Sequence, residues 1–185
     1  HKRLGNLFEA IRLNTKVTGL KDNGKGVDVS FEGPEGQTTE TFSRVLVAVG
    51  RRPNSDGIGL ENTDVVMDSK GFVEVDKQQR TADSHMLAIG DVCGEPMLAH
   101  RASHQGKVAV ESLHGEPALF EPRAIPAVVF TDPEIAWAGL TEHEAELSGQ
   151  EVEVSRYPWA ASGRAHALGR IEGMTKMLVD PETEQ

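Results

Sequence analysis

The stretch TADSHMLAIGDVCGEPMLAHRASHQG, residues 81–106, decides the fold of this chain. Its centre, LAIGDV at 87–92, is a short apolar run that stops at a glycine and an aspartate. We predict a buried strand with Asp91 at its carboxyl end, where open α/β sheets bind ligands. A carboxylate there can accept hydrogen bonds from the hydroxyls of a sugar or ribityl chain. The alternative is a plain turn, because Gly-Asp is also common turn chemistry.

A helix is expected directly after this turn. Leu98, Ala102, Ala109 and Leu113 keep near-helical spacing, and Gly115 is typical of a helix C-terminus. The first turn of such a helix has unpaired N–H groups and the positive end of the helix dipole, which favour an electron-rich group nearby. A carboxylate for hydroxyls and a helix start for an electron-rich ring, a few residues apart, suit a bound flavin.

Strands are expected on the N-terminal side of this unit. Residues 27–32 alternate apolar and polar side chains after the turn sequence KDNGKG at 21–26, which predicts a hairpin. Residues 44–50, RVLVAVG, are a continuous apolar run, which predicts a strand buried on both faces. GFVEVD at 71–76 alternates as a further strand, and HMLAIGD at 85–91 is the strand that ends at Asp91. The first part of the chain therefore has the pattern of an α/β fold.

The region after residue 120 changes to short strands interrupted by prolines, which indicates an α+β unit. Thr141 with Glu144 predicts a capping box at the start of a short helix that ends near Gly149. Phe130, Trp137 and Trp159 are candidates for its core or for a subunit interface, and both interpretations can hold.

The composition excludes several functional classes. The formal net charge of −10 comes from 29 dispersed acidic residues against 19 basic ones, which argues against nucleic acid and anionic membranes as partners. The single cysteine, Cys93, excludes an internal disulfide framework and a thiolate zinc cluster, and it indicates a reducing, cytoplasmic compartment. No apolar run approaches the roughly 18 residues needed to span a bilayer. Both ends have the character of cut positions, so we expect a fragment.

Residues 81–106 resemble the second FAD-binding motif of the flavin- and pyridine-nucleotide-dependent disulfide oxidoreductases, and GEPMLAH at 94–100 is similar to the dihydrolipoyl dehydrogenase branch of that family. Further segments agree in the right order. They are NTKVTGL at 14–20 with VLVAVGRRPN at 45–54, IPAVVFTDPEIAWAGLTEHEA at 125–145, and YPWAASGRAHALG at 157–169 followed by GMTKMLVD at 173–180. The resemblance covers nearly the whole chain.

The resemblance implies the site residues. Asp91, next to Gly90, would bind the ribityl chain of FAD. The residues along the flavin ring would be Met97, Leu98, Ala99 and His100. The residues bordering the NAD site would be Val17, Ala48, Val49, Gly50 and Arg51. No catalytic residue and no metal ligand is carried over to this chain.

The resemblance also implies a domain order. Residues 1–50 would be the C-terminal part of an NAD-binding domain, and residues 51–119 would be the central segment that completes a doubly wound FAD-binding domain. Residues 120–185 would be the N-terminal part of an α+β interface domain through which a homodimer forms.

The activity implied for the parent protein is the oxidation of protein-bound dihydrolipoamide, with electrons passing through a protein disulfide and FAD to NAD. A lipoyl domain of a 2-oxoacid dehydrogenase complex would be the partner. The family's Gly-rich phosphate turns, its pair of redox cysteines and its C-terminal His-Glu pair are absent from this sequence. We therefore predict that the chain alone does not turn over.

Several residues allow a second interpretation, as a metal ligand, a base or a cofactor contact. His100 and His104 are spaced as metal ligands on one helix face, but no third ligand is evident and the metal is rejected. His166 is not assigned as a base, Arg52 is treated as a solvated charge, and Cys93 as a small packing residue. Two alternatives for the function stay open: a non-enzymatic module that self-associates through about residues 120–179, and another branch of the family, such as mercuric or glutathione reductase.

Overall fold

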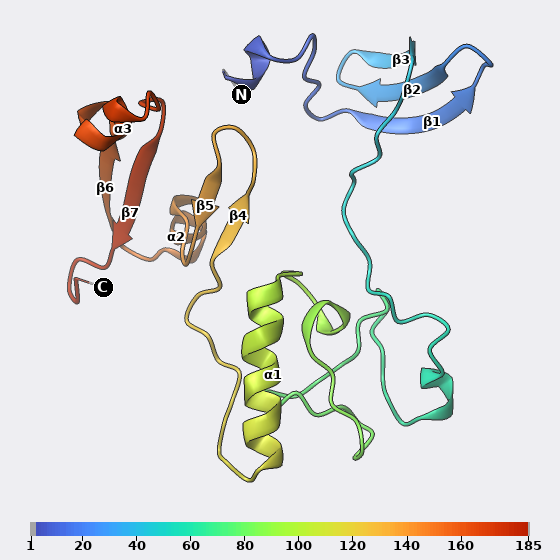
Figure 1. The fold of residues 1–185 in the computed structure, drawn as a ribbon, viewed down its shortest axis with the longest axis vertical. Coiled ribbons are helices and arrows are strands. Elements are labelled where there is room, and N and C mark those ends of the chain that lie inside the picture. The colour runs from blue at the N-terminus through green and yellow to red at the C-terminus, as the bar shows by residue number, and fades with distance from the viewer. Residues whose placement is uncertain (1–2, 185) are drawn as a thin grey trace. The chain divides into compact units, whose positions relative to one another are not determined.

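The computed structural model describes residues 3–184. The chain divides into two compact units, His1–Arg51 and Arg52–Gln185 (Figure 1). No helix among the described residues has the length and apolar character that a membrane span requires. The two units are described separately below.

The first unit is a three-stranded antiparallel sheet of β1 (Lys16–Asp22), β2 (Val27–Gly33) and β3 (Gly36–Phe42), in that order, preceded by the 3₁₀ turn η1 (Leu4–Asn6). The predicted hairpin is confirmed, since β1 pairs with β2 across residues 23–26. Val29 on the central strand is 3% exposed and is the centre of this small core. The rings of Phe31 and Phe42 meet edge to face beside it, at 6.2 Å between centroids.

The strand predicted at residues 44–50 is wrong. These residues belong to no strand, and Figure 1 shows the segment as an extended trace after β3. Leu46 and Val49 are 90% and 92% exposed. A strand is held by hydrogen bonds to neighbouring strands, and none of the described residues pairs with this segment. Without a neighbour, the apolar run stays open.

The second unit begins with turns rather than strands. The strands predicted at 71–76 and 85–91 are wrong, because each is reduced to a single bridge, Met67 with Val73 and Arg80 with Leu87. The Asp76 carboxylate accepts hydrogen bonds from the N–H groups of Gln78 and Arg80 at 2.8 and 2.9 Å, which turns the chain after one extended stretch. The short 3₁₀ helices η2 (Leu60–Asn62) and η3 (Gly90–Cys93) complete this region.

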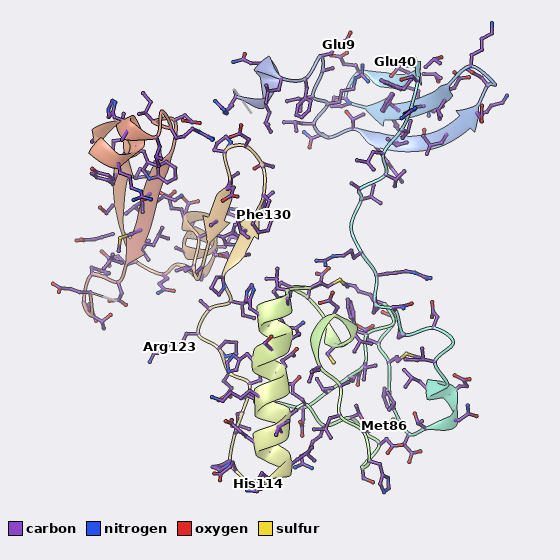
Figure 2. All side chains as sticks on the ribbon, in the orientation of Figure 1. Glu9, Glu40, Met86, His114, Arg123 and Phe130 are labelled. Carbon is purple, nitrogen blue, oxygen red and sulfur yellow. The ribbon has the colours of Figure 1, made fainter. Side chains whose placement is uncertain are left out.

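The predicted helix is confirmed as α1 (Ala99–Leu113), with Gly115 in the left-handed region after it. Figure 2 labels His114 at its C-terminal end. Of the predicted apolar positions, Ala109 is buried, whereas Leu113 is 62% exposed. The residues that α1 buries are Arg101, Gln105, Val108, Ala109 and Ser112.

The rest of the chain confirms the α+β prediction. The hairpin of β4 (Ala127–Val129) and β5 (Ile135–Trp137) is followed by α2 (Glu142–Ser148), by β6 (Glu153–Pro158), η4 (Trp159–Ala161) and α3 (Gly163–Ala167), and by β7 (Met174–Val179), which pairs with β6.

The capping box at the start of α2 is present. The Glu144 N–H donates to Thr141 Oγ1 at 3.2 Å, and the Thr141 N–H donates to Glu144 Oε2 at 2.9 Å. The Thr141 hydroxyl, which also donates to Glu144 Oε2 at 2.8 Å, and then the Thr141 N–H hold the pKa of the exposed Glu144 carboxyl below its usual value. The mixed α/β class predicted from the sequence is confirmed.

Candidate functional site

The Gly90–Pro96 turn carries the candidate cofactor residue Asp91. Gly90 and Asp91 open η3, and the Asp91 side chain is exposed while Gly90 is buried. Gly90 has φ +76°, and a Cβ built on it would lie 3.0 Å from the Cβ of Ala102 on α1. The close approach of this turn to the helix therefore requires a glycine. The turn presents a carboxylate to solvent from a backbone that is packed against α1.

Two polar side chains of α1 bind the backbone of this turn. The Gly90 N–H donates to Gln105 Oε1 at 2.8 Å, and Gln105 is 1% exposed. Arg101 Nη1 donates to the carbonyl of Gly94 at 2.5 Å, with longer contacts to those of Pro96 at 3.4 Å and Gly90 at 3.5 Å. Arg101 is 8% exposed. Both backbone groups of Gly90 therefore face side chains of one helix face.

The start of α1 lies directly after the turn. Met97 is 8% exposed, Leu98 is half-buried, and Ala99 and His100 are exposed. Leu98 is the N-cap, and no side-chain hydrogen bond from a described residue caps the helix there. The N–H groups of the first turn of this long helix are therefore not satisfied by a capping side chain.

The segment that leaves α1 returns along the helix. His100 Nε2 lies 2.8 Å from the carbonyl oxygen of Pro126, and the His104 ring meets Phe120 edge to face at 5.0 Å between centroids. Glu121 forms an ion pair with Lys77. The structure thus assigns the two histidines to contacts with residues 120–126. Among residues 3–184 no group of His, Cys, Asp and Glu side chains is placed to hold a metal ion.

Cys93 lies in the same turn and is half-buried. Burial raises the pKa of its thiol to about 11, against a smaller opposing effect of the Arg101 charge. A thiol with this pKa is almost fully protonated at neutral pH, and it is therefore a poor nucleophile. This environment fits a packing residue.

The residues expected to border NAD are not gathered in one element. Val17 lies in β1 opposite Phe31, whereas Ala48, Val49 and Gly50 lie in the exposed segment after β3, with Arg51 at its end. The described residues therefore do not form an assembled dinucleotide site here.

The flavin residues fit their expected ligand better. An exposed carboxylate on Asp91 and an uncapped start of α1 are eight positions apart and joined by one packed turn. The Asp91 carboxylate can accept hydrogen bonds from hydroxyl groups, and the positive end of the α1 dipole favours an electron-rich ring.

The sequence reading missed Arg101 and Gln105, although a signal for them existed. The positions 101, 105, 108 and 112 follow the spacing of one helix face, and they are all buried. Three of the four, Arg101, Gln105 and Ser112, are polar residue types that usually lie at the surface, and the apolar positions on which the helix prediction rests do not include the fourth, Val108. A buried polar residue on a helix face indicates a backbone partner opposite it.

Two family models and several dihydrolipoyl dehydrogenases match this chain. Residues 10–106 match the family model described as pyridine nucleotide-disulphide oxidoreductase, and residues 125–185 match the dimerisation domain of the same family. The chain is 45% identical over its whole length to a dihydrolipoyl dehydrogenase of Vibrio parahaemolyticus, and 45% identical over 95% of its length to one of Haemophilus influenzae. It spans 39% and 37% of the length of these relatives.

Solved structures show the same likeness. RclA of Escherichia coli, a HOCl-induced flavoprotein disulfide reductase studied as a copper(II) complex, matches with a TM-score of 0.84 and 27% identity over 95% of this chain and 39% of its own. LpdA of Mycobacterium tuberculosis matches with a TM-score of 0.81 and 28% identity over 92% of this chain and 37% of its own. Together with the matched family models, these likenesses show that the chain belongs to the pyridine nucleotide-disulphide oxidoreductase family.

Proposed function

We propose that this chain is part of an FAD-dependent dihydrolipoyl dehydrogenase. The observation that carries the proposal is the 45% identity to the Vibrio parahaemolyticus enzyme over all 185 residues. The same enzyme name recurs among relatives from other bacteria, at 41% identity in Bacillus subtilis. The sequence identity to the reductase RclA is lower, at 27%. It supports membership of the family and not a specific relation to RclA.

In this proposal the Gly90–Pro96 turn and the start of α1, up to His100, bind the flavin. The Asp91 carboxylate accepts hydrogen bonds from ribityl hydroxyls, and the N–H groups at the start of α1 stabilise negative charge at the edge of the ring. Met97 and Leu98, with Ala99 and His100, line the ring and limit the access of water. FAD, when bound, supplies the electron transfer between a dithiol and a nicotinamide.

The NAD side is proposed from residue positions alone. Val17, Ala48, Val49, Gly50 and Arg51 would border the nicotinamide nucleotide.

The chain does not carry the redox chemistry itself. A redox disulfide needs two cysteines, and the sequence has one, Cys93, whose thiol is protonated at neutral pH. We propose that the 185-residue chain alone does not oxidise dihydrolipoamide. Residues 120–185 would form part of a homodimer interface, and a lipoyl domain would deliver the dithiol; the reducing, cytoplasmic location inferred from the lone cysteine fits this role.

The proposal is tested in a chimera. The matching segment of the Vibrio parahaemolyticus enzyme is replaced by this chain, and the product is assayed for its flavin absorption band and for NAD-dependent oxidation of dihydrolipoamide. We expect a retained flavin and turnover within about tenfold of the unmodified enzyme, which is a change of less than about 1.4 kcal/mol in the barrier. Asp91→Ala in the chimera should reduce flavin content.

A folded chimera that binds FAD but is inactive on dihydrolipoamide, and active on glutathione disulfide or mercuric ion, would assign the chain to another branch. A folded chimera without flavin would contradict the proposal.

Self-association without enzymatic activity is the second candidate. It is favoured by the exposure of apolar side chains in the C-terminal region. Phe130, labelled in Figure 2, is 81% exposed, and Ile135, Met174 and Met177 are 57–60% exposed. Light scattering of the 185-residue chain tests it. A monomer at high concentration would exclude this candidate and leave the enzyme proposal untouched.

A further inference from the structure

We propose that Arg101 is a positioning residue which, through the backbone carbonyls of the Gly90–Pro96 turn, holds that turn closed against α1 and so sets the position of Asp91 for a flavin. The proposal rests on the proposed function for its flavin half. Its first half concerns the turn alone and is testable without a cofactor.

Arg101 is buried, and its charge is satisfied by main-chain carbonyls. The residue is 8% exposed, and arginine is almost never fully buried unless its charge is satisfied. All three oxygen partners that the structure gives it are main-chain carbonyls, those of Gly90, Gly94 and Pro96. Arg101 therefore stabilises the backbone conformation of the turn, because its contacts lie at both ends of the turn and in the middle.

The geometry of the turn is the second step. Gly94 is the near partner at 2.5 Å, and a Cβ built on Gly94 would lie 3.8 Å from Arg101 Nη2. Gln105, one helical turn further along α1, holds the N–H of Gly90 at 2.8 Å. The two side chains therefore fix opposite polar groups of the same glycine, on the residue before Asp91.

The chemistry required of residue 101 is the third step. A single nitrogen, Nη1, makes all three contacts, so the planar fork of arginine is not required. A lysine ammonium has three donors on one nitrogen and can replace it if the stem reaches. Methionine has no donor and keeps only the inner part of the apolar stem. Arg101→Lys thus keeps a donor at this position, whereas Arg101→Met removes it.

Cys93 reports on the turn from within it. We propose to measure the alkylation of Cys93 by iodoacetamide in the 185-residue chain and in its R101K and R101M variants. If Arg101 closes the turn, R101M should be alkylated about tenfold faster, which equals a loss of about 1.4 kcal/mol in closing free energy. R101K should stay within about twofold of the original chain by the same measure.

The direction of the change separates this role from a charge effect. The Arg101 charge lowers the pKa of the Cys93 thiol, so loss of the charge alone would raise that pKa and slow alkylation. Faster alkylation in R101M with an unchanged helical signal supports closure of the turn. An unchanged or slower rate overturns the proposal. If R101M loses the helical signal, R101Q replaces it, with the same direction required.

Arg80→Met is the matched control. Arg80 Nη2 donates to the carbonyl and Oγ of Ser112 at the other end of α1, at 3.3 and 3.0 Å. The substitution removes the same charge from contacts with the same helix, and it should leave Cys93 alkylation unchanged. Equal acceleration in R80M and R101M would show general loosening of the helix and would contradict a specific role of Arg101.

The effect of Arg101 on flavin binding is measured in the chimera by fluorescence titration with FAD. R101M should weaken FAD binding about tenfold and R101K less than threefold, with R80M unchanged. If the chimera binds no FAD in any form, the proposed function fails while the alkylation result still stands. If FAD binds equally well to R101M, Arg101 does not position the flavin site.

Discussion

Two regions of this chain are predicted to border a cofactor, and the structure gives them opposite states. The Gly90–Pro96 turn is fixed by buried side chains of α1, and Gln105 at 1% exposure binds the Gly90 N–H. Residues 44–50 are more apolar, yet Leu46 and Val49 are at least 90% exposed. An apolar sequence does not make a buried strand by itself. The backbone needs partners, and the turn finds them in the helix that follows it in sequence.

The largest expected effect comes from Gly90→Val. The substitution forces a β-branched residue to φ +76° and places its Cβ about 3.0 Å from that of Ala102, so we expect a loss of about 3–4 kcal/mol in the free energy of unfolding of the α1 region. Denaturation followed by far-UV circular dichroism measures it.

Gly115→Val is the control for that variant. Gly115 also has positive φ, but a Cβ built on it meets nothing within 4 Å, so it should cost only about 1–2 kcal/mol. Equal losses in the two variants would mean that close packing of the turn on α1 contributes nothing.

Gln105→Met sharpens the comparison at a single hydrogen bond. The variant keeps the length of the side chain and leaves the Gly90 N–H without its acceptor, which should cost about 2 kcal/mol in the free energy of unfolding. Gln78→Met, at a half-buried glutamine with a long contact to Arg80, should cost less than about 0.5 kcal/mol. A neutral result at Gln105 would show that the turn holds its position without this bond.

The titration of Cys93 gives a third test of burial in the turn. Since the folded pKa of the thiol is raised from 9.0 to about 11, alkylation of the native chain should still rise between pH 9 and 10 and level off only near pH 11. The raised pKa contributes stability below the unfolded pKa, and this contribution is lost as the pH rises toward 11. A rate that levels off near pH 9 would show that the turn is open.

The smallest effect is expected in the exposed segment. Leu46→Lys and Val49→Lys change side chains that are 90% and 92% exposed, so the free energy of unfolding should move by less than about 0.5 kcal/mol. Light scattering should show reduced self-association, because the substitutions place charges on an open apolar strand. A loss of stability above 1 kcal/mol in either variant would mean that the segment is packed in solution.

The sequence predicted the parts of this fold whose signals are local. The hairpin at residues 23–26, helix α1 and the Thr141–Glu144 capping box are each encoded within a few residues, and all are confirmed. The strands at 44–50, 71–76 and 85–91 were predicted from apolarity and alternation, which state what a strand would bury and not what it would pair with. Long-range pairing decided these cases.

The candidate site shows the same division. Asp91 and the start of α1 were predicted from a short motif, and in the structure a packed turn joins them. Arg101 and Gln105 escaped notice because their types suggest a surface position. Their role depends on carbonyl and N–H groups that only the folded turn presents to them. The roles of Asp91, Met97, Leu98, Ala99 and His100 toward FAD stay predictions.

Hydrogen exchange of the 185-residue chain tests the central claim most directly, namely that side chains of α1 hold the Gly90–Pro96 turn in place while residues 44–50 stay open. The amide of Gly90 should exchange at least about a hundredfold more slowly than those of Val47 and Val49, which corresponds to a difference of about 2.7 kcal/mol in opening free energy. Equal and fast exchange at Gly90 and Val49 would contradict the account.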